Sequence, residues 1–284
     1  MKSRLVESNS DRLQNIESNQ TTVVGVNKFT NTEKSPLVSG DGGIMVVDSL
    51  VEKDQIDRLN LWRSKRDEGL VNEALLNLRE AASEGRNIMP SSIQAAKAGA
   101  TTGEWAQEMR KIYGEYRGPT GVATGISNKT EGLEEIRSAV DAVSDRLGER
   151  LKFFIGKPGL DGHSNGAEQI ASRARDCGMN IEYQGIRLTP QELVETVKKT
   201  KSHVIGLSIL SGSHIPLVQD MINLLAQEGL TNIPIVVGGI IPEEDEVKLL
   251  KMGISKVYTP KDFEMNTIMM DIVNLAEPKE IAAE

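Results

Sequence analysis

The stretch that decides the fold is LKFFIGKPGLDGHSNGAEQIASRARDCGMNIEY, residues 151–183. An apolar segment of strand length leads into a glycine-rich loop, then a helical stretch, then a second apolar strand. The same alternation continues along the chain, with strands expected at 152–155, 180–183, 204–208, 235–237 and 256–258 and helices at about 165–177, 190–199, 214–228, 243–252 and 263–276. Five such repeats predict an α/β fold built on a doubly wound, mostly parallel, five-stranded sheet.

The part before this sheet has a different pattern. Residues 1–20 predict a polar helix, and the β-branched run Thr21–Phe29 predicts a strand. Apolar spacings of three and four residues predict helices between about 52 and 116, one of them capped by Thr102. Residues 119–127 contain glycines and a proline, as a linker does.

Two helices near the sheet have clear signals of their own. The stripe of apolar residues within 130–150 predicts an amphipathic helix that packs against the sheet. Thr189, Pro190 and Glu192 form a capping box with proline at the first helical position, which fixes a helix start.

Composition excludes several kinds of protein. The 284 residues carry a net charge of −8, and no apolar run approaches the roughly 18 residues of a membrane helix. An acidic chain is a poor general binder of nucleic acid, so we expect neither a nucleic-acid partner nor a membrane. The single cysteine excludes a disulfide framework and a cysteine-based zinc site. The first residues form no apolar signal segment, and we expect a cytoplasmic protein.

The loop after the first strand of this sheet carries the chemistry. Ligands of such sheets bind at the carboxyl ends of the strands, and this loop places His163 there, two residues after Asp161 and six after Lys157. A neutral imidazole binds a metal through one nitrogen while an acceptor such as Asp161 holds the other. Lys157 either pairs with Asp161 or is a solvated lysine, and His163 is either a metal ligand or a surface histidine.

No other loop offers a clear second metal ligand. His203 lies at the opposite edge of the sheet, His214 follows the loop after the third strand, and Cys177 is expected in the core. A metal held by one protein side chain takes its other ligands from a cofactor, which favours a macrocycle over bare zinc.

Three motifs occur in order at successive strand ends: Asp161-x-His163-x-x-Gly166, Ser208-x-Leu210 and Gly238-Gly239. Together they resemble the cobalamin-binding domain family over about 151–278, which implies a flavodoxin-like fold. Residues 23–29 and 114–121, with the helices between them, resemble the segment after the substrate barrel in adenosylcobalamin-dependent acyl-CoA mutases of the ethylmalonyl-CoA and methylmalonyl-CoA type.

This resemblance implies a role for each motif. His163 would be the lower ligand of cobalt in place of the cofactor's dimethylbenzimidazole base, with Asp161 and Lys157 behind it. Ser208 and Leu210 would line a slot for the displaced nucleotide tail. The other residues implied to contact the cofactor are Gly162, Ser164 and Gly166 in the loop, Gly238 and Gly239, which give clearance, and Tyr258 and Thr259, which close the slot.

The resemblance also implies an organisation in three parts. Residues 1–50 would be the tail of a barrel domain, 51–129 a helical linker and 130–284 the cobalamin-binding domain. The acyl-CoA substrate would bind to a barrel domain or partner subunit outside this chain, so no catalytic residue is assigned here and an oligomer is expected. Two alternatives remain: a corrinoid carrier for methyl transfer, and a non-enzymatic cobalamin sensor or delivery module.

Overall fold

The computed structural model describes residues 2–30, 50–115 and 132–278. The chain divides into two units, one formed by residues 1–32 with 118–284 and the other by residues 33–117. The linker expected at 119–127 lies outside the described residues, and the three-part division of the chain stays a prediction. In the ranges that the structure describes, every helix is too short or too polar to span a lipid bilayer.

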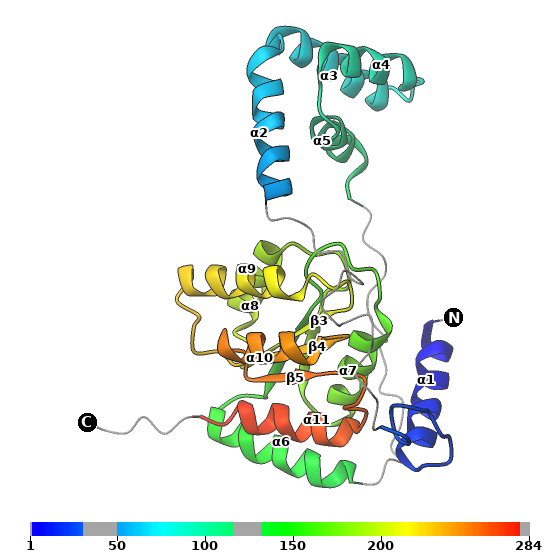
Figure 1. Cartoon of the computed structure of the whole chain (residues 1–284), viewed down its shortest axis with the longest axis vertical. Helices are drawn as coiled ribbons and strands as arrows, with labels where there is room; N and C mark the ends of the chain where they lie inside the picture. Colours follow the sequence, from blue (N-terminus) through cyan, green and yellow to red (C-terminus); the bar gives the residue numbers. More distant parts are fainter. Residues whose placement is uncertain (1, 31–49, 116–131, 279–284) are drawn as a thin grey trace, which may run out of the picture. The chain divides into compact units, whose positions relative to one another are not determined.

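The first unit contains the predicted five-stranded sheet, in which every strand is parallel to its neighbours (Figure 1). Its strands are β1 (Lys152–Gly156), β2 (Asn180–Tyr183), β3 (Val204–Ile209), β4 (Ile235–Gly239) and β5 (Lys256–Tyr258). They lie in the order β2-β1-β3-β4-β5, which is the flavodoxin-like order. The predicted fold class is therefore confirmed.

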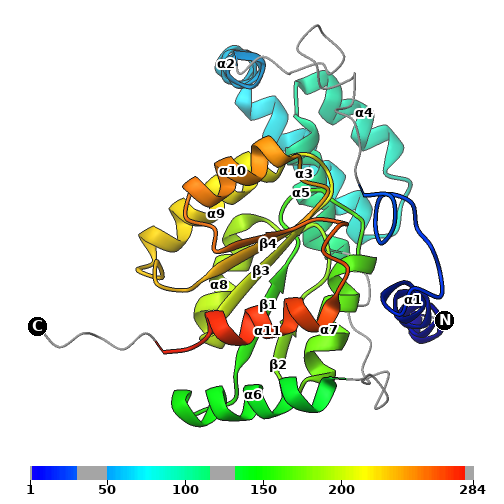
Figure 2. The same ribbon diagram turned by 60° about the horizontal axis from the view of Figure 1, so that its bottom comes forward.

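Helices cover both faces of the sheet (Figures 1 and 2). They are α6 (Leu133–Leu147), α7 (Asn165–Asp176), α8 (Pro190–Thr200), α9 (His214–Gln227), α10 (Glu243–Lys251) and α11 (Met265–Leu275). Buried residues of α6, α7 and α11 form one core with the sheet, and those of α8, α9 and α10 form the other. The chain changes direction across the sheet between β1 and β3, and the crevice for a ligand lies there in folds of this kind.

Local signals fix two of these helices as expected. Thr189 accepts a hydrogen bond from the backbone of Glu192, whose carboxylate accepts from the Thr189 backbone in return, so the predicted capping box is confirmed. The apolar stripe of α6 is buried in the core that it shares with α7 and α11, as the helical spacing predicted.

The N-terminal segment contains a helix and a turn. Helix α1 (Lys2–Glu17) confirms the predicted polar helix, but the strand predicted for Thr21–Phe29 is wrong. Those residues form a turn closed by an isolated bridge between Val24 and Lys28. The side chain of Asn27 donates to the carbonyls of Ile16 and Thr21 and accepts from the Val23 N–H, which occupies backbone groups that a sheet would need.

The second unit is helical, as predicted. It comprises α2 (Leu50–Lys65), α3 (Glu68–Ser83), α4 (Met89–Ala98) and α5 (Thr102–Tyr113), with a small core contributed mainly by α3. Thr101 rather than Thr102 caps α5, through a capping box with Glu104. Arg66 forms a two-pronged ion pair with Glu104, and this hydrogen bonding lowers the pKa of Glu104 to about 2.

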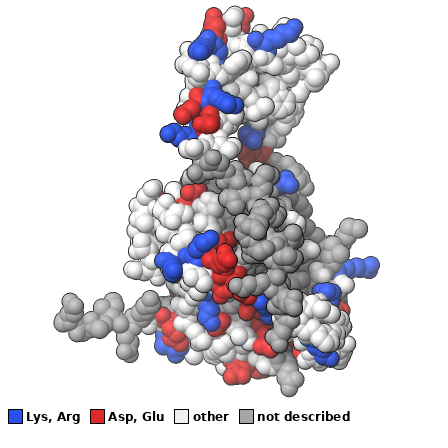
Figure 3. All heavy atoms as spheres, in the orientation of Figure 1, with Lys and Arg blue, Asp and Glu red and all other residues white. Residues whose placement is uncertain are grey.

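Charged side chains of both signs lie interspersed on the face shown in Figure 3.

Replacing Thr189 with Ala tests the capping box. Loss of the hydroxyl leaves the Glu192 N–H without its acceptor, and we expect the free energy of unfolding in urea to fall by about 1 kcal/mol. The matched control is Glu195→Ala on the exposed side of the same helix, which should change the free energy by less than about 0.5 kcal/mol. Equal effects of the two substitutions would contradict this account of the cap.

Candidate functional site

Asp161 lies in the loop after β1 and hydrogen-bonds to the backbone just after β3. The strand order reverses between these two strands. The side chain of Asp161 is fully buried. Oδ1 accepts from the backbone N–H of His163 at 2.9 Å, and Oδ2 accepts from the backbone N–H of Leu210 at 2.7 Å. The carboxylate thus fixes the position of one loop against the other.

Lys157 lies beneath this carboxylate, at the end of β1. Its side chain is fully buried, and Nζ donates to Asp161 Oδ2 at 3.2 Å, to the Ser208 carbonyl at 2.9 Å and to the Ser208 hydroxyl at 3.2 Å. Burial lowers the pKa of Lys157, and the neighbouring Asp161 partly opposes that shift. The solvated-lysine alternative is therefore wrong, and the pairing with Asp161 is present.

The environment keeps Asp161 ionised. Burial alone would raise its pKa, but the N–H donors of His163 and Leu210, the His163 ring and the charge of Lys157 together hold it well below the usual range. A carboxylate that receives several backbone N–H donors is stabilised in its charged form. It can therefore act as a permanent acceptor for the imidazole beside it.

His163 points outward from this arrangement. Its Nδ1 lies 2.7 Å from Asp161 Oδ1, while 73% of its side chain is exposed. With a carboxylate as partner, Nδ1 carries the proton and the Nε2 lone pair is left on the opposite edge of the exposed ring. Lys157, Asp161 and His163 therefore form the chain of contacts expected from the sequence, and it ends in a nitrogen able to bind a metal.

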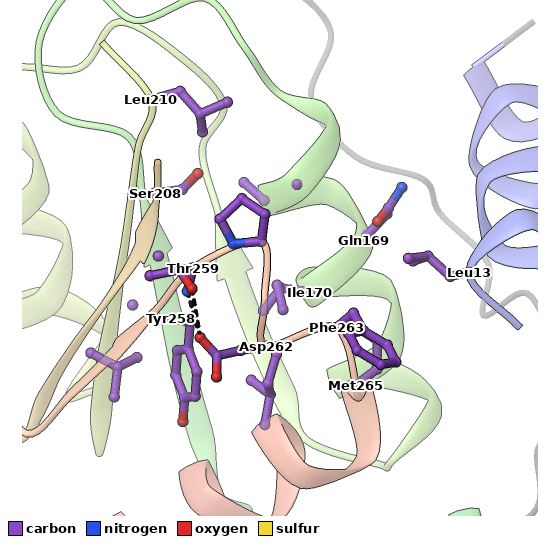
Figure 4. Close-up of a pocket in the computed structure, with 18 of the residues that line it drawn as sticks. Leu13, Gln169, Ile170, Ser208, Leu210, Tyr258, Thr259, Asp262, Phe263 and Met265 are labelled. Carbon is purple, nitrogen blue, oxygen red and sulfur yellow. Dashed lines mark hydrogen bonds between the residues drawn. The ribbon is translucent and has the colours of Figure 1, made fainter. Parts of the chain in front are cut away.

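A cavity of about 420 Å³ opens at the same end of the sheet (Figure 4). The sheet and helix α7 contribute to its wall. Seven of the predicted site residues line it: Gly166, Ser208, Leu210, Gly238, Gly239, Tyr258 and Thr259. Its lining is mostly apolar, and Figure 4 shows Ser208, Tyr258 and Thr259 along one side, with Ile170 and Met265 across from them.

The adjacent glycines Gly238 and Gly239 line this cavity, and each lacks a side chain for a different reason. A methyl group added at Gly238 would meet no atom within 4 Å, so the missing side chain leaves open space at the cavity. At Gly239 the added carbon would lie 1.9 Å from the carbonyl oxygen of Ile209, its partner in β3. Gly238 thus gives the clearance that we expected, whereas Gly239 is required by the backbone of the neighbouring strand.

The remaining candidates lie elsewhere. Gly162 and Ser164 belong to the His163 loop and are not among the residues that line the cavity. His203 accepts from the Lys152 N–H at the amino end of β1, and His214 is buried against Asp245. Cys177 lies in the core, where burial raises the pKa of its thiol to about 11.

Sequence reasoning missed part of the cavity wall. The N-terminal segment contributes Arg12, Leu13, Ile16, Val23 and Val26, and β3 contributes Gly206. Gly206 could have been found, because a glycine inside an apolar strand marks a close approach. The added carbon there would lie 2.8 Å from the ring of Phe153. The N-terminal residues carried no such signal.

The described residues include no group of three or more His, Cys, Asp and Glu side chains able to hold a metal ion. Comparison with known proteins shows which families the chain resembles. Residues 1–115 match the family model described as methylmalonyl-CoA mutase, and residues 151–261 match the B12 binding domain. The chain therefore resembles the methylmalonyl-CoA mutase family in its first part and B12 binding domains in its second. Its second matched region is the domain that binds B12, or cobalamin, and includes the His163 loop and most of the cavity.

Curated relatives agree with this family. The chain is 61% identical over its full length to ethylmalonyl-CoA mutase of Cereibacter sphaeroides and 52% identical over 98% of its length to that of Methylorubrum extorquens. It is 30% identical over 91% of its length to methylmalonyl-CoA mutase of Cereibacter sphaeroides. It spans 43%, 40% and 36% of the length of these three relatives, less than half of each.

Alanine substitutions at the two adjacent glycines should separate their roles. Gly239→Ala forces β3 and β4 apart, and we expect it to lower the free energy of unfolding by about 3 kcal/mol or more. Gly238→Ala meets open space and should leave that free energy unchanged within about 0.5 kcal/mol. Urea denaturation of both variants measures this, and a Gly239→Ala protein as stable as Gly238→Ala would refute the close approach at Ile209.

The depressed pKa of Asp161 predicts how stability depends on pH. Because the folded-state pKa lies below the unfolded one, the carboxylate stabilises the fold fully above the unfolded pKa. That contribution is lost as pH falls through the folded pKa. Below about pH 5 the free energy of unfolding should therefore fall less steeply in Asp161→Asn than in the unaltered chain. Parallel curves would show that Asp161 does not titrate in this way.

Proposed function

We propose that this chain is the cobalamin-holding part of an adenosylcobalamin-dependent acyl-CoA mutase, with His163 as the lower ligand of cobalt. The observation that carries the proposal is the outward-facing imidazole whose Nδ1 is held by the buried Asp161. When bound, the cofactor supplies a radical through homolytic cleavage of its cobalt–carbon bond. The residues of this chain hold the cofactor and position it.

The chain of contacts from Lys157 through Asp161 to His163 suits an imidazole that binds a metal already held by a macrocycle. Asp161 accepts the Nδ1 proton, which fixes the tautomer and the plane of the ring and raises the basicity of Nε2. Lys157 holds Asp161 from below and keeps it charged through a direct contact. Gly162 and Ser164 flank His163 in sequence and Gly166 lies in the first turn of α7, and we assign all three contacts with the cofactor.

The cavity would receive the nucleotide tail that His163 displaces. An apolar cavity with one wall left open by Gly238 fits an aromatic base and its ribose. Ser208 and Leu210 line it, and Tyr258 and Thr259 stand at the end of β5 along its side (Figure 4). In this proposal the cobalt ligand and the tail site occupy neighbouring positions at one edge of the sheet.

For the substrate we favour an ethylmalonyl-CoA-type acyl-CoA over a methylmalonyl-CoA-type one. Support comes from the higher identity to the two ethylmalonyl-CoA mutases. We place the acyl-CoA site on a barrel domain or partner subunit that joins this chain in a larger assembly. The radical rearrangement of the carbon skeleton would take place there, against the cofactor that this chain presents.

His163→Gly tests the cobalt ligand. The unaltered chain should bind adenosylcobalamin with the absorption spectrum of the form in which an imidazole has replaced the dimethylbenzimidazole base. The variant should lose that spectrum, because the other basic nitrogen of the loop, Lys157 Nζ, is buried and donates to Asp161 and Ser208. Added free imidazole should restore it. Asp161→Asn should bind about tenfold more weakly, because the ring loses its orienting partner.

A matched control is His203→Gln, at the amino end of the strands, which should leave the spectrum unchanged. If His163→Gly kept both the spectrum and the affinity of the unaltered chain, the ligand assignment would be wrong. Tight binding of methylcobalamin, with none of adenosylcobalamin, would favour the corrinoid carrier instead.

A further inference from the structure

Part of the cavity wall comes from outside the sheet and its helices. We call residues 12–26 the N-terminal cap. Its apolar members Leu13, Ile16, Val23 and Val26 line the cavity together with Arg12. Ile16 is 3% exposed, and Figure 4 shows Leu13 near Gln169 of α7 at the side of the cavity. The cap therefore completes the apolar enclosure that the sheet begins.

Specific contacts hold the cap in place. Glu17 follows Ile16 at the end of α1, and its Oε1 accepts a hydrogen bond from the backbone N–H of Met265 at 3.1 Å. Met265 begins α11, and a carboxylate at a helix N-terminus is favourable because of the helix dipole. Asn27 ties the turn to the Ile16 carbonyl at 2.9 Å. Figures 1 and 2 both show α1 beside α7.

The charges around the cavity favour an anionic ligand at the cap. Asp262 also lines the cavity, but its carboxylate already accepts from the N–H of Thr259 at 2.7 Å and from its hydroxyl at 3.1 Å (Figure 4). Tyr258 donates its hydroxyl to Asp271 at 3.1 Å. Among the described lining residues, Arg12 is the one that carries a positive charge. It is exposed, as a residue that meets an incoming ligand would be.

We propose that the N-terminal cap closes over the nucleotide tail of cobalamin, with Arg12 binding the phosphodiester and the apolar cap residues contacting the base. This inference rests on the proposed function and adds to it a second element of the binding site, about 140 residues before the cobalt ligand in sequence. A guanidinium suits this task, because it binds phosphate oxygens with paired donors.

The experiment compares three corrinoids on the full chain. Cobalamin has the phosphodiester and the base, cobinamide phosphate has the phosphate without the base, and cobinamide has neither. Dissociation rates are followed by absorbance after the bound corrinoid is chased with excess cofactor. Arg12→Gln should speed the release of cobalamin and cobinamide phosphate about three- to tenfold and leave cobinamide unchanged. Its effect should shrink at high salt, because exposed charges are screened.

A second variant tests the apolar residues of the cap. Val26→Ser should speed the release of cobalamin about threefold or more, and that of cobinamide and cobinamide phosphate not at all, because only cobalamin carries the base. Two matched controls should affect none of the three corrinoids. Arg4→Gln removes the same charge from the exposed side of α1, and Val24→Ser alters a side chain that is 73% exposed in the same turn.

The outcomes separate this inference from the proposed function. Equal effects of Arg12→Gln on all three corrinoids, or effects no larger than those of Arg4→Gln, would overturn the role of the cap while leaving the cobalt ligand intact. If the unaltered chain bound no cobalamin, the proposed function itself would fail, and this inference with it. Circular dichroism of each variant shows that a faster release does not reflect unfolding.

Discussion

The buried carboxylate of Asp161 sets the geometry of the sheet edge where β1 and β3 end. It binds the backbone of Leu210 at the tip of β3, the backbone and ring of His163, and the ammonium of Lys157. An unpaired charge at this depth would cost several kcal/mol. The two loops are therefore held together wherever the fold is intact, and the imidazole inherits its orientation from that constraint.

The same contacts link His163 to the cavity. Lys157 donates both to Asp161 and to Ser208, and Ser208 and Leu210 line the cavity. A displacement of the tip of β3 would also be felt at His163 through Asp161, which accepts from the Leu210 N–H and contacts the His163 ring. In the proposed function, this linkage lets one rigid edge hold the ligand and the displaced tail in fixed relation.

Much of this architecture could be predicted from the sequence, because strands and helices of the sheet alternate with clear periodicity. The positions of Lys157, Asp161 and His163 in the sequence also predicted correctly that these side chains form a chain of contacts. The spacing could not show that Lys157 is buried. Nor could it show that the Leu210 N–H donates to Asp161, since every residue except proline has a backbone N–H and its residue type does not indicate the partner. Thr21–Phe29 resembled a strand, but Asn27 holds it as a turn. The cap was missed because its contacts join residues more than 100 positions apart.

The most direct test of the central claim uses electron paramagnetic resonance. The chain is produced with ¹⁵N-labelled histidine and loaded with the Co(II) form of unlabelled cobalamin. If His163 is the axial ligand, each line split by that nitrogen should change from the triplet of ¹⁴N to the doublet of ¹⁵N. A triplet that persists in the labelled protein would mean that the cofactor keeps its own base, and would contradict the account.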